Sequence, residues 1–103
     1  MDLREEAKKR DIGIGSLVEI NLLKGANFNM IASSFPCVFN PETPTELRGE
    51  TVSGYIIKID AESENNSYFD VHPSPNPRGV NLLGGFRVYS KAVHSFNTAS
   101  SKK

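Results

Sequence analysis

The fold is decided by one stretch, which reads Thr51-Val52-Ser53-Gly54-Tyr55-Ile56-Ile57-Lys58-Ile59-Asp60. β-branched and aromatic residues dominate it, and this composition is typical of a strand. Gly54 interrupts the run. A residue without a Cβ atom lets a sheet curve sharply or lets a neighbouring strand approach closely. The stretch therefore predicts a long strand with a bend at Gly54.

Four shorter strands are predicted around this one. Val18, Ile20 and Leu22 alternate with their neighbours, which indicates a half-buried strand that ends before Lys24-Gly25. Short apolar or aromatic runs bounded by Gly, Pro and Asn predict the other three strands, at residues 68–72, 86–90 and 93–97. We therefore expect a mostly β chain whose five strands form a strongly bent small barrel, with SH3-like barrels and oligonucleotide-binding folds as related all-β solutions.

The chain ends predict a helix and a tail around a single domain. Residues 2–10 are good helix formers with Glu and Lys at ion-pair spacing, and Asp2 can cap their start. With 103 residues, the chain has room for one core. The predicted organisation is an N-terminal helix at 1–12, one β-barrel domain at 13–98, and a disordered tail at 99–103.

Residues 26–48 form an insert between the first two predicted strands. Its first half is apolar, with Phe28, Met30 and Phe35, and its second half has turn composition around Pro41 and Pro44. A structureless loop of this length is rare in a compact domain. We therefore expect part of the insert to form an extra strand or a flap on the barrel.

Composition excludes several classes of protein. Twelve basic and twelve acidic residues give a net charge of zero, which argues against a protein that coats DNA. The single cysteine, Cys37, excludes a disulfide framework and a cysteine-rich zinc module. No apolar run is long enough for a membrane span, and the charged N-terminus lacks a signal-peptide core. We expect a soluble protein of the cytoplasm, with the nucleus as an alternative, and no membrane partner.

Three segments resemble the Sm/LSm/Hfq family of small β-barrel proteins. Val52-x-Gly54-x-Ile56-x-x-x-Asp60 is similar to the family's first motif, and residues 15–25 are similar to its first strand and turn. The segment from Val88 to Phe96, with Tyr89-x-x-Ala92, resembles its second motif in the bacterial form, Tyr-Lys-His-Ala. The resemblance covers about half of the chain. It implies an Sm-like barrel that assembles into a ring and binds single-stranded RNA.

The chain departs from the family pattern in three places. The family joins its first two strands by a tight turn, where this chain carries the insert at 26–48. The asparagine that the family places shortly after the aspartate is displaced to Asn65 or Asn66, and Ser90-Lys91 stands where the bacterial form has Lys-His.

The candidate RNA contacts lie around the predicted turn after Asp60. Amide and carboxylate edges can read an unstacked base, a tyrosine can stack on it, and cations can meet phosphate. The alternative is structural: Asp60 and the asparagines make the turn, the tyrosine packs, and the cations form a solvated surface. The candidates are Asp60, Asn65, Asn66, Tyr68, Arg87 and Lys91.

We expect no catalysis, no cofactor and no metal. Asp70 and His72 share one face of a predicted strand, but zinc needs three or four ligands, and Cys37 lies in the insert. No sequence signature pairs Cys37 with a histidine as a nucleophile.

Two functions follow from these patterns. The first is an Sm-like RNA-binding or ribonucleoprotein-assembly module that forms a homo-oligomeric ring. The second is a protein-interaction adaptor on an SH3-like barrel, with the insert at 26–48 as the surface that binds a protein partner. Sm-like rings join through their fourth and fifth strands, and the two predicted strands at the C-terminal end have no proline and only one formal charge, at Arg87, to guard their edges. The interface candidates are Phe86, Val88, Val93 and Phe96.

Overall fold

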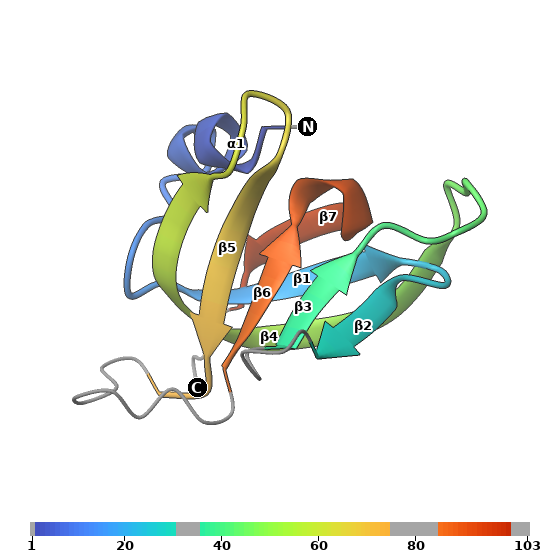
Figure 1. Ribbon diagram of the computed structural model, residues 1–103. Coiled ribbons are helices and arrows are strands. Elements are labelled where there is room, and N and C mark those ends of the chain that lie inside the picture. The colour runs from blue at the N-terminus through green and yellow to red at the C-terminus, as the bar shows by residue number, and fades with distance from the viewer. Residues whose placement is uncertain (1, 31–35, 75–84, 100–103) are drawn as a thin grey trace.

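The computed structural model describes residues 2–30, 36–74 and 85–99. The described chain is mostly β, with one short helix at its N-terminal end (Figure 1). Residues 100–103 of the predicted disordered tail and much of the proline-rich segment after His72 lie outside the described residues, whereas the backbone N–H of Ala99 donates to the carbonyl of Leu17 at 2.9 Å. The elements are α1 (Leu3–Lys9), β1 (Leu17–Leu23), β2 (Asn27–Met30), β3 (Pro36–Phe39), β4 (Arg48–Ala61), β5 (Ser67–His72), β6 (Phe86–Tyr89), the 3-10 turn η1 (Ser90–Ala92) and β7 (Val93–Thr98).

The seven strands form one mixed sheet in the order β2-β3-β6-β5-β4-β1-β7. All neighbours are antiparallel except β3 and β6, which run parallel. The prediction of a mostly β chain with an N-terminal helix is confirmed. The count of five strands is wrong for the described chain, because the insert supplies two more. The sheet is also not closed or strongly curled, since β2 and β7 stand at its opposite ends.

The long strand β4 joins the two halves of the sheet. Residues from Arg48 to Tyr55 pair with β1, whereas residues from Tyr55 to Ala61 pair with β5, so the partner changes at Tyr55. Gly54 lies beside this change. A Cβ atom there would stand 2.4 Å from Val71 Cγ1 and 3.0 Å from the carbonyl oxygen of His72. The glycine therefore allows β5 to approach β4 closely.

The core lies on one face of the sheet, and α1 packs over part of it. Alternation along β1 buries Val18, Ile20 and Leu22, as the sequence predicts. Leu3 and Ala7 are the two buried residues of α1 and belong to the same cluster. In the described chain no helix is long and apolar enough to cross a membrane.

Polar contacts hold the helix in place. Asp2 caps α1 by accepting a hydrogen bond from the backbone N–H of Arg4 at 3.0 Å. The first helical N–H, that of Leu3, donates to Ser67 Oγ at the start of β5, at 2.9 Å. Because a helix of seven residues is marginal alone, these contacts and the two apolar residues fix where it lies.

The insert folds as a hairpin that extends the sheet. β2 pairs with β3 in register, with Asn27 opposite Phe39, and β3 pairs with β6 through Cys37 and Val38. Val38 is fully buried in the main core, whereas Cys37 and Phe39 face the other side of the sheet. The expectation of an extra strand in the insert is confirmed. The same pairing places β6 inside the sheet rather than at an edge.

Candidate functional site

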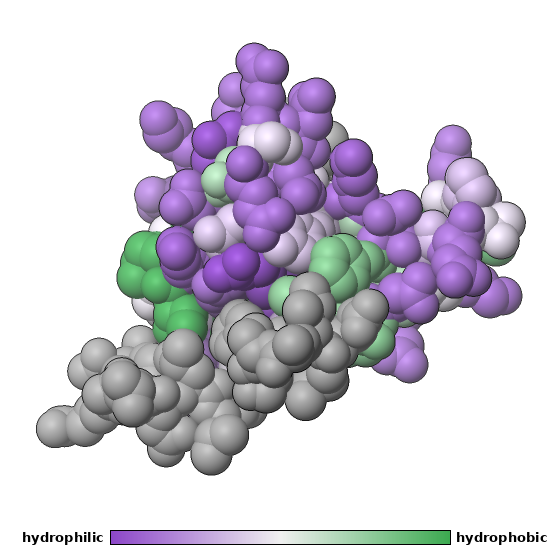
Figure 2. All heavy atoms as spheres, viewed as in Figure 1, coloured by the Kyte–Doolittle hydropathy of each residue, from purple (hydrophilic) through white to green (hydrophobic). Residues whose placement is uncertain are grey.

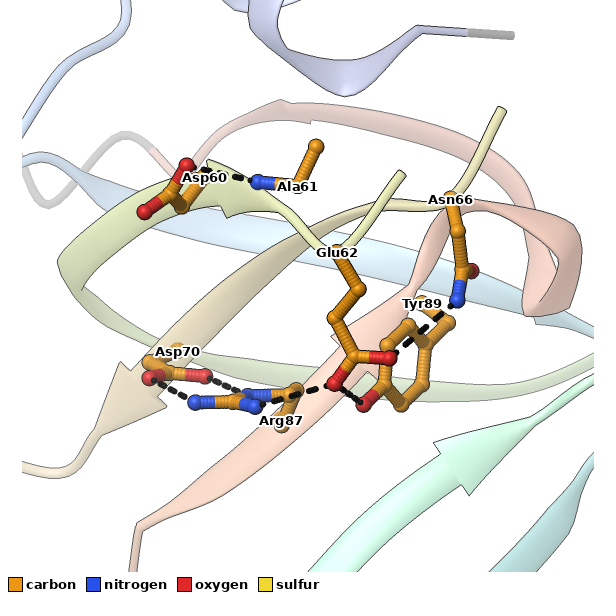
Figure 3. A network of polar contacts seen from close by, with 7 residues as sticks. All are labelled: Asp60, Ala61, Glu62, Asn66, Asp70, Arg87 and Tyr89. Atoms are coloured by element: carbon orange, nitrogen blue, oxygen red, sulfur yellow. Dashed lines mark hydrogen bonds and ion pairs between the residues drawn. The ribbon is translucent and has the colours of Figure 1, made fainter. Parts of the chain in front are cut away.

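A cluster of aromatic and charged side chains covers the face of the sheet opposite the main core. We call it the tyrosine–arginine cluster, and Figure 3 shows its polar contacts. Strand alternation brings it together, since Phe69, Val71 and Val88 point into the main core while the residues between them point outward. Its members are Glu62, Tyr68, Asp70, Arg87 and Tyr89.

An ion pair between Asp70 and Arg87 lies at the centre of the cluster. The two residues stand opposite one another on β5 and β6. Arg87 donates from Nε to Asp70 Oδ1 at 2.7 Å and from a terminal nitrogen to Asp70 Oδ2 at 3.1 Å, a two-pronged geometry. Its other terminal nitrogen lies 3.5 Å from Glu62 Oε2. The hydrogen bonds that Arg87 donates to Asp70 raise the pKa of the Arg87 guanidinium above its ordinary value.

The ring of Tyr68 is covered by cations. The guanidinium carbon of Arg87 lies 4.0 Å from the ring centroid, and Lys58 Nζ lies 5.9 Å from it. Tyr68 keeps only 5% of its surface exposed. A nucleic-acid base would have to displace Arg87, and so break its contacts with Asp70, before it could stack there.

Tyr89 is held by its hydroxyl and by its ring. The hydroxyl donates to Glu62 Oε2 at 2.6 Å. The ring stacks on Phe39 of the insert at 5.1 Å and meets Tyr68 edge-on at 5.7 Å. Burial, followed by the bond to Glu62, raises the pKa of Tyr89 to about 12. The hydroxyl therefore stays protonated, and the insert is fastened to the cluster by an aromatic stack.

The predicted loop residues serve the turn between β4 and β5. Asp60 Oδ1 accepts the backbone N–H of Ala61 at 2.8 Å (Figure 3). Asn66 donates to Glu62 Oε1 at 3.4 Å, and its backbone N–H bonds to the carbonyl of Ser63. Asn65 is exposed at the turn. The contacts of Asp60 and Asn66 match the structural alternative that the sequence left open, in which these residues make the turn.

The charge around this turn is negative. Asp60, Glu62 and Glu64 are all exposed there, while Arg87 is engaged with two carboxylates. Lys91 is exposed on η1, directly after β6. Carboxylates repel phosphate, so the region offers little of the positive potential that drives nucleic-acid binding.

The histidine and the aspartate considered for metal binding are each engaged in other contacts. His72 accepts the backbone N–H of Ser74 on Nδ1 at 2.9 Å, while Asp70 holds Arg87. Burial raises the pKa of the Cys37 thiol, which keeps it protonated and poorly nucleophilic. Across residues 2–30, 36–74 and 85–99, no group of three or more His, Cys, Asp and Glu side chains could hold a metal ion.

The four predicted interface residues belong to the chain's own interior. Val88, Val93 and Phe96 are buried in the main core, and Phe86 packs against it. β6 lies between β5 and β3, so its edges are both paired. The sequence predicts that the edges of these two strands pair between copies; in the described sheet β3 already occupies the outer edge of β6, whereas β7 stands at one end of the sheet.

A second feature is a groove beside the insert. It has a volume of about 460 Å³ and lies between the end of β1, the turn that leads to β2, and the start of β4. Phe28 of β2 lines it and keeps 53% of its surface exposed. Leu47, just before β4, is 61% exposed. On the face seen in Figure 2, hydrophilic residues cover the end that carries α1, and hydrophobic residues appear beside β3.

Several of these residues gave little signal in the sequence. Tyr89 belongs to the segment that resembles the second motif, but its contacts with Glu62 and Phe39 join segments far apart in the chain. The pairing of Asp70 with Arg87 depends on the register of β5 and β6. A long proline-rich segment joins these strands in the sequence, and no short turn between them fixes their register.

Comparison with protein-family models, with curated proteins and with solved structures finds no match to this chain. The resemblance of its motifs to the Sm/LSm/Hfq family therefore stays a prediction.

Proposed function

We propose that this chain is an Sm-like small β domain that works as a protein-interaction module, with the insert as its binding surface. The observation that carries the proposal is the position of the insert hairpin. β3 occupies the outer edge of β6, the insert is fastened by the stack of Phe39 on Tyr89, and Phe28 stays half-exposed beside a groove. An exposed aromatic side chain next to a concave surface is typical of protein–protein contact sites.

The state of the candidate RNA contacts supports the same choice. Tyr68 is 5% exposed under the guanidinium of Arg87, and Arg87 itself is engaged with Asp70 and Glu62. A surface that binds single-stranded RNA needs free aromatic faces and unneutralised cations. In the tyrosine–arginine cluster, Tyr68, Tyr89 and Arg87 are instead engaged in contacts that hold the outer face of the sheet together.

RNA binding in the manner of an Sm-like protein is the competing proposal. The order of elements supports it, since α1 precedes β1, Gly54 lies inside β4, Asp60 stands at the end of that strand, and Tyr89 comes just before η1 and β7. Asn65 and Lys91 are exposed and would be its first contacts.

Assembly into a homo-oligomer also stays a prediction, with a changed geometry. Because β3 pairs with β6, the described sheet ends at β2 and β7, so any edge-to-edge contact between copies would use those two strands. Light scattering coupled to size exclusion measures the mass directly. A mass of 11.3 kDa over a wide concentration range would contradict assembly.

Two measurements separate the protein-interaction proposal from RNA binding. Short U-rich and A-rich RNAs are titrated at low and high salt, and we expect no salt-sensitive binding. In parallel, the tagged chain is used to capture partners from its source cells, with Phe28→Asp and Lys91→Glu as paired variants. We expect one partner that Phe28→Asp loses and Lys91→Glu keeps. Salt-sensitive RNA binding that Lys91→Glu weakens, without such a partner, would overturn the proposal.

A further inference from the structure

The groove beside the insert has a shape that the backbone imposes. Gly49, at the start of β4, lies so close to the turn after β1 that a Cβ atom on it would stand 2.7 Å from Lys24 Cα. Leu23 O and Lys24 N would both lie 3.0 Å from the same atom. Any side chain at residue 49 would push the two walls apart. The glycine thus allows β4 to approach the turn after β1 closely and keeps one end of the groove narrow.

One part of the groove is apolar. Leu22 is 1% exposed and belongs to the main core, while Ala26 packs partly against that core. Phe28 stands at the same groove with 53% of its surface exposed. A hydrophobic side chain of a partner would be removed from water by contact with Phe28, and burial of that kind is favourable in proportion to the apolar area.

The rim of the groove carries a small excess of positive charge. Lys24 and Arg48 are exposed there, with Glu50 as the one acidic lining residue. Within the part of the chain that the structure describes, no ion pair within 4.0 Å engages either cation. Arg48 donates only a long hydrogen bond, 3.3 Å, to Thr51 Oγ1. This differs from Arg87, whose charge is met by two carboxylates.

We infer that this groove binds a short extended segment of a partner protein, in which a hydrophobic side chain stands next to an Asp or Glu. The hydrophobic side chain packs against Phe28, and the carboxylate meets Lys24 and Arg48. The inference rests on the proposed protein-interaction function and specifies its partner. A segment of this chemistry complements both the apolar wall and the unpaired cations, and Glu50 disfavours a uniformly anionic ligand such as RNA.

The test starts from random peptides rather than from a known partner. A phage-displayed library of short random peptides is selected on the intact chain, and the enriched peptides are synthesised and titrated by fluorescence anisotropy. We expect enriched peptides that combine a large hydrophobic residue with an adjacent acidic one. Phe28→Ala and Arg48→Glu should each weaken their binding about tenfold or more. Lys91→Glu makes the same charge change at an exposed site elsewhere and should leave binding within about twofold.

A charge exchange gives the second arm of the test. The double variant Lys24→Glu/Arg48→Glu, selected against the same library, should enrich peptides with Lys or Arg beside the hydrophobic residue. Thermal melts of every variant check that the fold is kept. Failure to enrich any peptide, or enriched peptides whose binding ignores Phe28→Ala and Arg48→Glu, would overturn the inference. The proposed function would survive that result if the captured partner is still lost by Phe28→Asp, and it would fail on its own if no such partner exists.

Discussion

Replacement of Gly54 by alanine tests the close approach of β4 and β5. The added Cβ would stand 2.4 Å from Val71 Cγ1 and 3.0 Å from the carbonyl oxygen of His72. Carbon atoms in contact prefer separations of about 3.5–4.0 Å, so the first contact overlaps by more than about 1 Å. Val71 is fully buried and β-branched, which leaves it few rotamers, and the carbonyl belongs to a paired strand.

Neither neighbour of the new methyl group can move freely, so the substitution overpacks the sheet. Overpacking of this kind costs about 1–3 kcal/mol. For a chain of this size, each 1 kcal/mol lowers the melting temperature by roughly 4–8 °C. Urea denaturation measures the free energy of unfolding, and a thermal melt gives the temperature shift.

A double-mutant cycle identifies the cause of the loss. Val71→Ala removes the Cγ1 atom that the new methyl group meets, so Gly54→Ala should cost less in that background, with a coupling energy of about 0.5–3 kcal/mol. Gly13→Ala is the matched control, because a Cβ atom on Gly13 would meet nothing within 4 Å. The reasoning is refuted if Gly54→Ala leaves stability unchanged, or if its cost is the same with and without the Val71 side chain.

Three further predictions concern single groups. The pKa of Tyr89 is raised from 10.0 to about 12, so its contribution to stability is complete below pH 10 and is lost as the pH rises towards 12. Between these pH values, urea denaturation of the parent chain should show a fall in the free energy of unfolding that is larger than the fall in Tyr89→Phe by on the order of 2–3 kcal/mol. Equal falls in the two chains would refute the role of Glu62 and burial. Ser67→Ala leaves the Leu3 N–H without its acceptor and should cost about 1–3 kcal/mol, with faster hydrogen exchange at that amide; unchanged exchange would contradict it. Asp2→Ala removes the helix cap and should lower the free energy of unfolding by about 0.5–2 kcal/mol, seen as a lower melting temperature. An unchanged melting temperature would contradict a role for the cap.

Much of the secondary structure could be predicted from the sequence because its signals are local. Alternation along residues 17–22 predicts β1, and the buried residues of that strand are Val18, Ile20 and Leu22. The charge spacing of residues 2–10 predicts α1, and Asp2 caps it. The glycine in the long strand predicts a close approach, and the neighbours of Gly54 confirm it. Each of these features depends on residues a few positions apart.

The candidate site was harder to predict because it depends on residues distant in sequence. The sequence around Tyr68 is the same whether its ring is exposed to solvent or covered by another side chain. Only the register of β5 and β6 places Arg87 over the ring. The sequence places Asp70 beside His72 on one face of its own strand, whereas the side chain that Asp70 binds, Arg87, lies on the neighbouring strand. A shift of one residue in the register between two strands changes every cross-strand partner. The sequence of one strand does not reveal that register.

The sequence by itself determined the strands outside the insert, which of their faces are apolar, and where a glycine is needed, because these depend on the side chains of adjacent residues. Only the tertiary structure decided where the insert goes. Its strands β2 and β3 could have lain on the sheet as a flap, but β3 pairs in parallel with β6. A strand at the edge of a sheet presents unpaired N–H and C=O groups, and any extended segment that the fold brings beside it can pair with them. In this chain β3 pairs with the free edge of β6, and Phe28 of the same hairpin lies beside an open groove.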